Sequence, residues 1–112
     1  MRYLLLISAD ESRIDDAVSP EALAEFRRWL TDLQHRGMLR AHVGLHPSNT
    51  ATTVRVRGAE VLLTDGPFAE TKDQVGGLAI IECDDLDEVI GIAAGHPAAA
   101  WGQVEIRPVI EP

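Results

Sequence analysis

Short runs of alternating or continuously apolar residues predict six strands along the chain. Two of these runs, residues 2–7 and 77–82, are apolar on both faces, so each face needs a cover. Between residues 39 and 45, alternation separates an apolar row from a row that holds His42. The dipeptide Gly58-Ala59 predicts a hairpin, because glycine tolerates the positive φ of a two-residue turn. The predicted strands are residues 2–7, 39–45, 52–57, 60–64, 77–82 and 103–110.

Two stretches instead have apolar residues at helical spacing. The first runs from Pro20 to Arg36, with Ser19 as its N-cap and Gly37 as its C-terminal cap. The second begins after Asp85 and ends before Gly95-His96-Pro97. The apolar positions are Leu23, Phe26, Leu30 and Leu33 in the first helix, with Trp29 at the edge of the stripe, and Leu86, Val89, Ile90 and Ala93 in the second.

This order of elements, β-α-β(ββ)-α-β, predicts an α+β ferredoxin-like sandwich with an extra hairpin, formed by residues 1–112 as a single domain. Two helices cover only one face of a sheet. Because two of the strands are apolar on both faces, we expect the second face to pack on the same face of another copy, in an obligate homodimer.

Charge and cysteine usage narrow the class of partners. The net charge of −8 over 112 residues disfavours nucleic acid and anionic membrane surfaces. The apolar run at the start is too short to span a bilayer. The lone Cys83 lies in an apolar run and predicts a reduced core thiol, which favours a cytoplasmic location.

The stretch from Asp65 to Gly77 holds more turn formers and charges than a plain connector needs, and this predicts the wall of a binding site. Asp65, which precedes Gly66-Pro67, either caps a turn or acts as a buried base. Lys72 is the only lysine in the chain and either holds a ligand carboxylate or pairs with a neighbouring acid. Phe68 either anchors the loop from beneath or lines a ligand pocket.

Further candidates lie on the predicted strands. Glu105 and Arg107 share a strand face, which suits cross-strand ion pairs or a clamp by Arg107 on an anionic ligand. His42 is the best general-base candidate, since it lies opposite the apolar row of its strand. His42 and His46 would stand about 13 Å apart, too far to share one zinc ion, and no metal site is predicted. His35 and His96 are interpreted as helix-end residues that favour the negative helix termini.

Three segments together resemble the YCII-related proteins, in the branch named for its DGPF motif. They are Thr64 to Lys72 followed by Gly76-Gly77, Ala51 to Arg55, and Val104 to Val109. The resemblance implies a dimeric ferredoxin-like α+β barrel with a small-molecule site between helices and sheet. It also implies a link to extracytoplasmic-function sigma factors, to which members are fused or adjacent. The His and Asp pair of other relatives does not carry over, because no His stands near the start of the helix at Ser19.

The function hypothesis that follows is a small dimeric protein that binds an organic, anionic ligand, or a cofactor-free acid-base enzyme of the isomerase or lactone type. His42 or Asp65 would move the proton, and Lys72 or Arg107 would hold the anion. Phe68 and Glu105 complete the predicted site. The alternative is a regulatory or interaction module that binds a sigma factor without catalysis.

Overall fold

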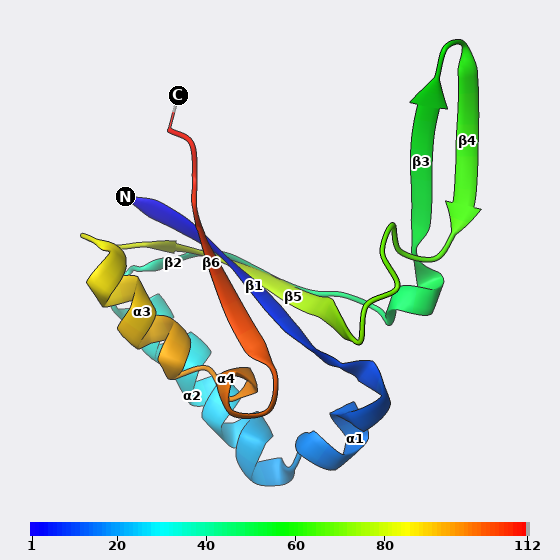
Figure 1. Ribbon diagram of the computed structural model, residues 1–112. Helices are drawn as coiled ribbons and strands as arrows, with labels where there is room; N and C mark the ends of the chain where they lie inside the picture. The colour runs from blue at the N-terminus through cyan, green and yellow to red at the C-terminus, as the bar shows by residue number, and fades with distance from the viewer. Residues whose placement is uncertain (112) are drawn as a thin grey trace.

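The computed structural model describes residues 1–111. Four antiparallel strands form one sheet in the order β2-β5-β1-β6, and the helices lie on one side of it (Figure 1). This arrangement is the predicted ferredoxin-like α+β fold. The elements are β1 (Arg2–Asp10), the 3-10 helix η1 (Glu11–Arg13), α1 (Ile14–Ala17), α2 (Pro20–His35), β2 (Leu39–Gly44), η2 (Ser48–Thr50), β3 (Thr52–Arg57), β4 (Glu60–Asp65), β5 (Asp73–Glu82), α3 (Leu86–Ala94), α4 (Ala98–Trp101) and β6 (Gln103–Pro108).

Both long helices begin at the predicted caps. The Ser19 hydroxyl accepts a hydrogen bond from the Ala22 amide at 3.1 Å, and the Asp85 carboxylate accepts one from the Glu88 amide at 2.9 Å. Gly37 follows α2 with a φ of 69°, the left-handed conformation that ends many helices. Within residues 1–111, no helix is both long and apolar enough to cross a membrane.

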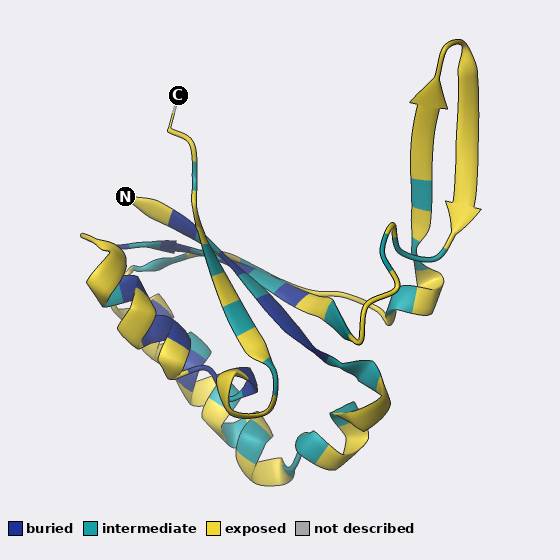
Figure 2. Cartoon of the chain, in the orientation of Figure 1, coloured by how far each residue is buried: buried dark blue, intermediate teal, exposed yellow. Residues whose placement is uncertain are grey.

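The core lies between the sheet and the two long helices, where Figure 2 shows the buried positions. Its most completely buried large side chains are Leu5, Leu33, Ile81 and Val89. Trp29 is buried as predicted, and its indole N–H donates a hydrogen bond of 2.8 Å to the carbonyl of Ile92. This bond joins α2 to α3 and satisfies the polar group of a buried ring.

Two bounds of the predicted elements are wrong. Residues 11–17, which belong to none of the predicted elements, form η1 and α1, and β5 begins at Asp73 instead of Gly77. The cause of the second error is pairing, because Ala9 and Asp10 of β1 continue the ladder opposite Gln74 and Asp73. A β-bulge at Gly76 interrupts this ladder, and it shifts the register of β5 against β1.

One face of the sheet has no helix on it. Side chains alternate along a strand, so the neighbours of the buried Leu5 and Ile81 point to this side. These are Leu4 and Leu6 on β1, and the register places Ile80 and Leu78 of β5 opposite them. We call this the uncovered face, and within this chain it forms an apolar strip that is only partly buried.

The hairpin of β3 and β4 projects away from the helices and from the sheet (Figure 1). Its register sets Arg57 opposite Glu60 and Val56 opposite Val61, as predicted from the two-residue turn. Gly58 has a φ of 61° in that turn. Residues 54–65 are all exposed, so the hairpin takes no part in the core of its own chain.

Candidate functional site

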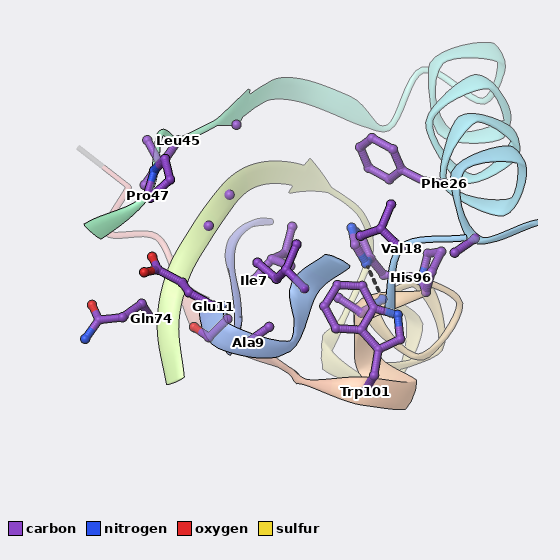
Figure 3. Close-up of a pocket in the computed structure, with 18 of the residues that line it drawn as sticks. Ile7, Ala9, Glu11, Val18, Phe26, Leu45, Pro47, Gln74, His96 and Trp101 are labelled. Carbon is purple, nitrogen blue, oxygen red and sulfur yellow. Dashed lines mark hydrogen bonds between the residues drawn. The ribbon is translucent and has the colours of Figure 1, made fainter. Parts of the chain in front are cut away.

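A cavity of about 620 Å³ lies between the sheet and the N-terminal end of α2, closed at its sides by α1 and α4 (Figure 3). Pockets of this size hold small organic ligands. Most of its lining is apolar, and the apolar side chains come from elements far apart in the sequence. They are Ile7, Ala9, Ile14, Val18, Ala22, Leu23, Phe26, Leu45, Pro47, Pro97, Ala98 and Trp101.

Two polar residues of the lining hold the framework together. The Glu11 carboxylate accepts hydrogen bonds from the amide and the hydroxyl of Ser48, both at 2.8 Å. The Gln74 side-chain amide donates 3.0 Å hydrogen bonds to the carbonyls of Ala69 and Thr71. Glu11 therefore joins η1 to η2, and Gln74 ties the preceding loop to β5, at the end of the cavity where Figure 3 shows both residues.

His96 lies at the other end of the cavity, between α3 and α4. Its Nδ1 accepts a hydrogen bond of 3.0 Å from the Ala98 amide, so the proton of the neutral ring sits on Nε2. Burial, with a smaller contribution from His42, lowers the pKa of His96 to about 4. No buried side-chain nitrogen among the described residues lacks a partner, so Nε2, which makes no protein hydrogen bond, keeps accessible surface, and His96 lines the cavity. His96 is therefore a neutral hydrogen-bond donor at neutral pH.

His42 reaches the same end of the cavity from β2. Its ring centroid lies 5.3 Å from that of Phe26, and Phe26 lies 5.3 Å from His96 as well. Trp29 packs edge-on against His96 at 4.8 Å. Two imidazoles therefore flank one aromatic ring, where one can donate a hydrogen bond while the other accepts a proton.

Between the two ends of the cavity, the sheet carries glycine in place of side chains. Gly44 of β2 pairs with Gly77 of β5, and both line the cavity. Gly44 does not have a positive φ, and a Cβ added there would meet no atom within 4 Å. Neither backbone conformation nor packing requires glycine at this position. The bare backbone leaves room for a flat group to lie on the sheet.

The structure places the predicted residues of the loop outside this cavity. Asp65 lies at the end of β4 and lines a separate, shallower depression of about 420 Å³ with Gly66, Pro67 and Glu70. Lys72 is exposed. Phe68 is 82% exposed, so its predicted role as an anchor beneath the loop is wrong. Of the predicted site residues, only His42 lines the large cavity.

Glu105 and Arg107 lie on the uncovered face, where the register sets them opposite Leu6 and Leu4. The Arg107 guanidinium donates a hydrogen bond to the Glu105 carboxylate, and both side chains are largely exposed. This pair lies within one strand and is not the predicted cross-strand ion pair, and the anion clamp stays a prediction. The helix-facing positions of β6 are Val104 and Ile106, which pack against the core.

The interpretation of His96 as a helix-end charge is wrong, because a buried ring with a pKa near 4 is uncharged at neutral pH. The sequence signal was weak, since Gly95-His96-Pro97 reads as a helix stop. His42 does lie opposite the apolar row of β2, as predicted, but that row is divided, because Leu39 packs against the core and Leu45 lines the cavity. Val43 and Leu45 are each 50% exposed. Within the described residues, no three or more His, Cys, Asp or Glu side chains are grouped to hold a metal ion.

Comparisons with known proteins show the family and the fold of the chain. The YCII-related domain model matches residues 1–112. An uncharacterized protein of Rhizobium meliloti (strain 1021) is 36% identical, over 97% of this chain and 92% of its own length. A solved structure is similar at a TM-score of 0.59 and 15% identity, covering 100% of this chain and 96% of the other. It is the 5-chloro-2-hydroxyhydroquinone dehydrochlorinase (TftG) from Burkholderia phenoliruptrix AC1100 in complex with 2,5-dihydroxybenzoquinone.

Proposed function

The chain belongs to the YCII-related domain family, and from that premise we propose that it binds a small cyclic organic molecule in the cavity and catalyses a cofactor-free proton transfer on it. The observation that carries the proposal is the placement of His42 and His96 beside Phe26 at one end of a mostly apolar cavity. Convergent polar groups at one end of an apolar pocket are typical of ligand sites.

The lining also suggests the class of ligand. The described lining contains no Lys or Arg, and its open backbone at Gly44 suits a flat ring. We therefore propose a planar ring with an enolic or phenolic oxygen, which a neutral imidazole can hold without a fixed cation. The similar dehydrochlorinase structure holds a hydroxylated quinone, which has this chemistry.

In the proposed reaction, the ligand binds in its keto form, with a saturated ring carbon next to a carbonyl, and His42 accepts a proton from that carbon. Negative charge then develops on the carbonyl oxygen, and the Nε2–H of His96 stabilises it by a hydrogen bond. His42 returns the proton at another ring position, so the product is an isomer of the substrate and the protein ends unchanged. The apolar lining excludes water from the intermediate.

Other parts of the hypothesis stay predictions. Asp65 as a base and Lys72 or Arg107 as an anion holder lie outside this cavity. A regulatory role through a sigma factor also stays a prediction from the resemblance. We propose in addition that the uncovered face pairs with that of a second copy, because Leu4, Leu6, Leu78 and Ile80 have no cover within the chain.

Thermal-shift titration and calorimetry test the ligand. The probes are 2,5-dihydroxybenzoquinone, simple phenols and unsaturated lactones, and the variants are His42→Gln and the control His35→Gln, at an exposed position late in α2. We expect a planar hydroxylated ring to raise the melting temperature of wild type and of the control, and to bind His42→Gln at least about tenfold more weakly. Equal affinity for all three proteins, or no binding to wild type, contradicts the proposed site.

A further inference from the structure

We infer that the apolar face of the β3–β4 hairpin packs on a second copy of this chain. The inference rests on the dimer proposed above, because it takes the partner to be a second copy of this chain. It does not depend on the proposed ligand. It assigns to the hairpin a role that the fold of a single chain does not give it.

The two faces of the hairpin differ in composition. Side chains of paired residues lie on the same face, so the pairing separates one set from the other. One face carries Val54, Val56, Val61 and Leu63, with Thr52 and Asp65 at its base, and the other carries Thr53, Arg55, Arg57, Glu60, Leu62 and Thr64. The four apolar residues of the first face are between 57% and 68% exposed. We call this the hairpin's apolar face.

An exposed apolar face is energetically unfavourable for a hairpin that is surrounded by water. Two strands without further support are marginally stable, and an edge of unpaired backbone groups with apolar side chains favours association. A hairpin with water on both sides would be expected to carry polar residues on both faces. The clustering of four aliphatic residues on one face indicates that another surface covers them.

The accessible surface area of the chain also supports a partner, because the chain exposes more surface than a compact monomer of its mass. It exposes 7743 Å², whereas a compact monomer of 12.2 kDa exposes about 6,100 Å². The excess of roughly 1,700 Å² falls within the area that one chain buries in an obligate dimer, about 1,000–2,500 Å². The radius of gyration, 15.9 Å, also exceeds the roughly 13 Å of a compact chain of this length.

The position of the hairpin identifies the second copy as the occupant. The helices lie on one side of the sheet, and the hairpin projects away from them (Figure 1). The uncovered face is also apolar and lacks helices, so two copies that pair their sheets bring each hairpin beside the partner. The hairpin's apolar face then extends the interface beyond the sheet.

Sedimentation velocity across the nanomolar to micromolar range tests the inference with two adjacent residues of β4. Leu63→Lys places a charge on the apolar face, and Thr64→Lys places the same charge on the opposite face. Both positions are exposed in the single chain, so both variants should keep its fold and far-UV circular dichroism. Ile80→Lys, on the uncovered face, reports on the sheet contact separately.

We expect wild type and Thr64→Lys to be dimers, and the dissociation constant of Leu63→Lys to rise at least about 100-fold. Dimers of equal strength for Leu63→Lys and Thr64→Lys, with a monomer for Ile80→Lys, would overturn the role of the hairpin and leave the sheet contact intact. A monomeric wild type at micromolar concentration would overturn both. Ligand titration of the same variants tests the cavity separately, so failure of the proposed dimer contacts can be distinguished from failure of the proposed ligand site.

Discussion

The two faces of the central sheet have similar apolar strands and different surroundings. On the covered face, Leu5 and Ile81 are fully buried beneath α2 and α3, and the cavity with His42 and His96 opens at one end. On the uncovered face, Leu4 and Leu6 are only partly buried in the single chain. Alternation along a strand therefore determines which face of the sheet a residue lies on. The element that packs on that face determines whether the residue belongs to the core, lines the cavity or stays exposed in the single chain.

The largest expected effect is on the free energy of unfolding, and it distinguishes residues that pack in the core from residues that contribute to association. Leu5→Ala should lower the free energy of unfolding by about 3–4 kcal/mol at every protein concentration, because it leaves a cavity within the chain. Leu6→Ala should cost little at low concentration and more at high concentration, where a dimer contributes stability. Urea unfolding at low and high protein concentration measures both. A concentration-independent effect of Leu6→Ala would break the comparison between the faces.

The next effect is the pH dependence of the free energy of unfolding, which arises from His96 on the covered face. His96 has a pKa of about 4 in the folded chain and an ordinary value of 6.5, so the unfolded chain binds more protons between these values. Stability is therefore complete above pH 6.5 and should fall by about 2–3 kcal/mol as the pH decreases to 4. Urea midpoints across this range measure the loss.

His96→Gln is the matched variant, since it cannot titrate. Its stability should change less between pH 6.5 and 4, even if it is lower throughout. Exposed carboxylates act in a different window, because a hydrogen bond from Arg40 lowers the pKa of Glu82 and one from Ser12 lowers that of Asp10. An unchanged slope in the variant would show that His96 is not the responsible group.

A smaller effect contrasts the faces of a single strand. Gly44→Val fills the open space on the cavity side of β2 and should weaken the binding of a planar ring at least about tenfold, with little change in melting temperature. Ala41→Val, two strand positions from Val43 on the outward side, should leave ligand affinity unchanged. Calorimetric titration with 2,5-dihydroxybenzoquinone compares them. Equal binding by both variants would place the ligand elsewhere.

The smallest effect concerns the ion pair on the uncovered face. Arg107→Ala should change the free energy of unfolding by less than about 0.5 kcal/mol, because the pair with Glu105 is largely exposed. Urea unfolding at low protein concentration is the measurement. A loss of several times this size would mean that the pair is shielded from water, as it would be if a second copy covered it.

Local chemistry was sufficient to predict most elements. The caps at Ser19 and Asp85, the hairpin turn at Gly58 and the burial of Trp29 depend on neighbours in sequence or on a stripe along one helix, and each was confirmed. The early start of β5 was missed, because it depends on pairing with the end of β1. A strand extended by its partner carries little signal of its own.

The candidate site divides in the same way. Alternation along the strand was sufficient to predict the position of His42 opposite the apolar row. The role of Phe68 was predicted from the composition of its loop, and composition does not determine which side chains face solvent. His96 becomes a neutral donor only because α2, α3 and α4 enclose it and because the Ala98 amide takes its Nδ1.

Periodicity, caps and turn residues thus fix the ferredoxin-like order of strands and helices within the chain, since each depends on contacts a few residues apart. The lining of the cavity extends along the chain from Ile7 to Trp101, and its two imidazoles, His42 and His96, are 54 positions apart. The distance between such groups depends on how the helices pack on the sheet. No local pattern encodes that distance, because burial and the resulting desolvation exist only once the layers have packed.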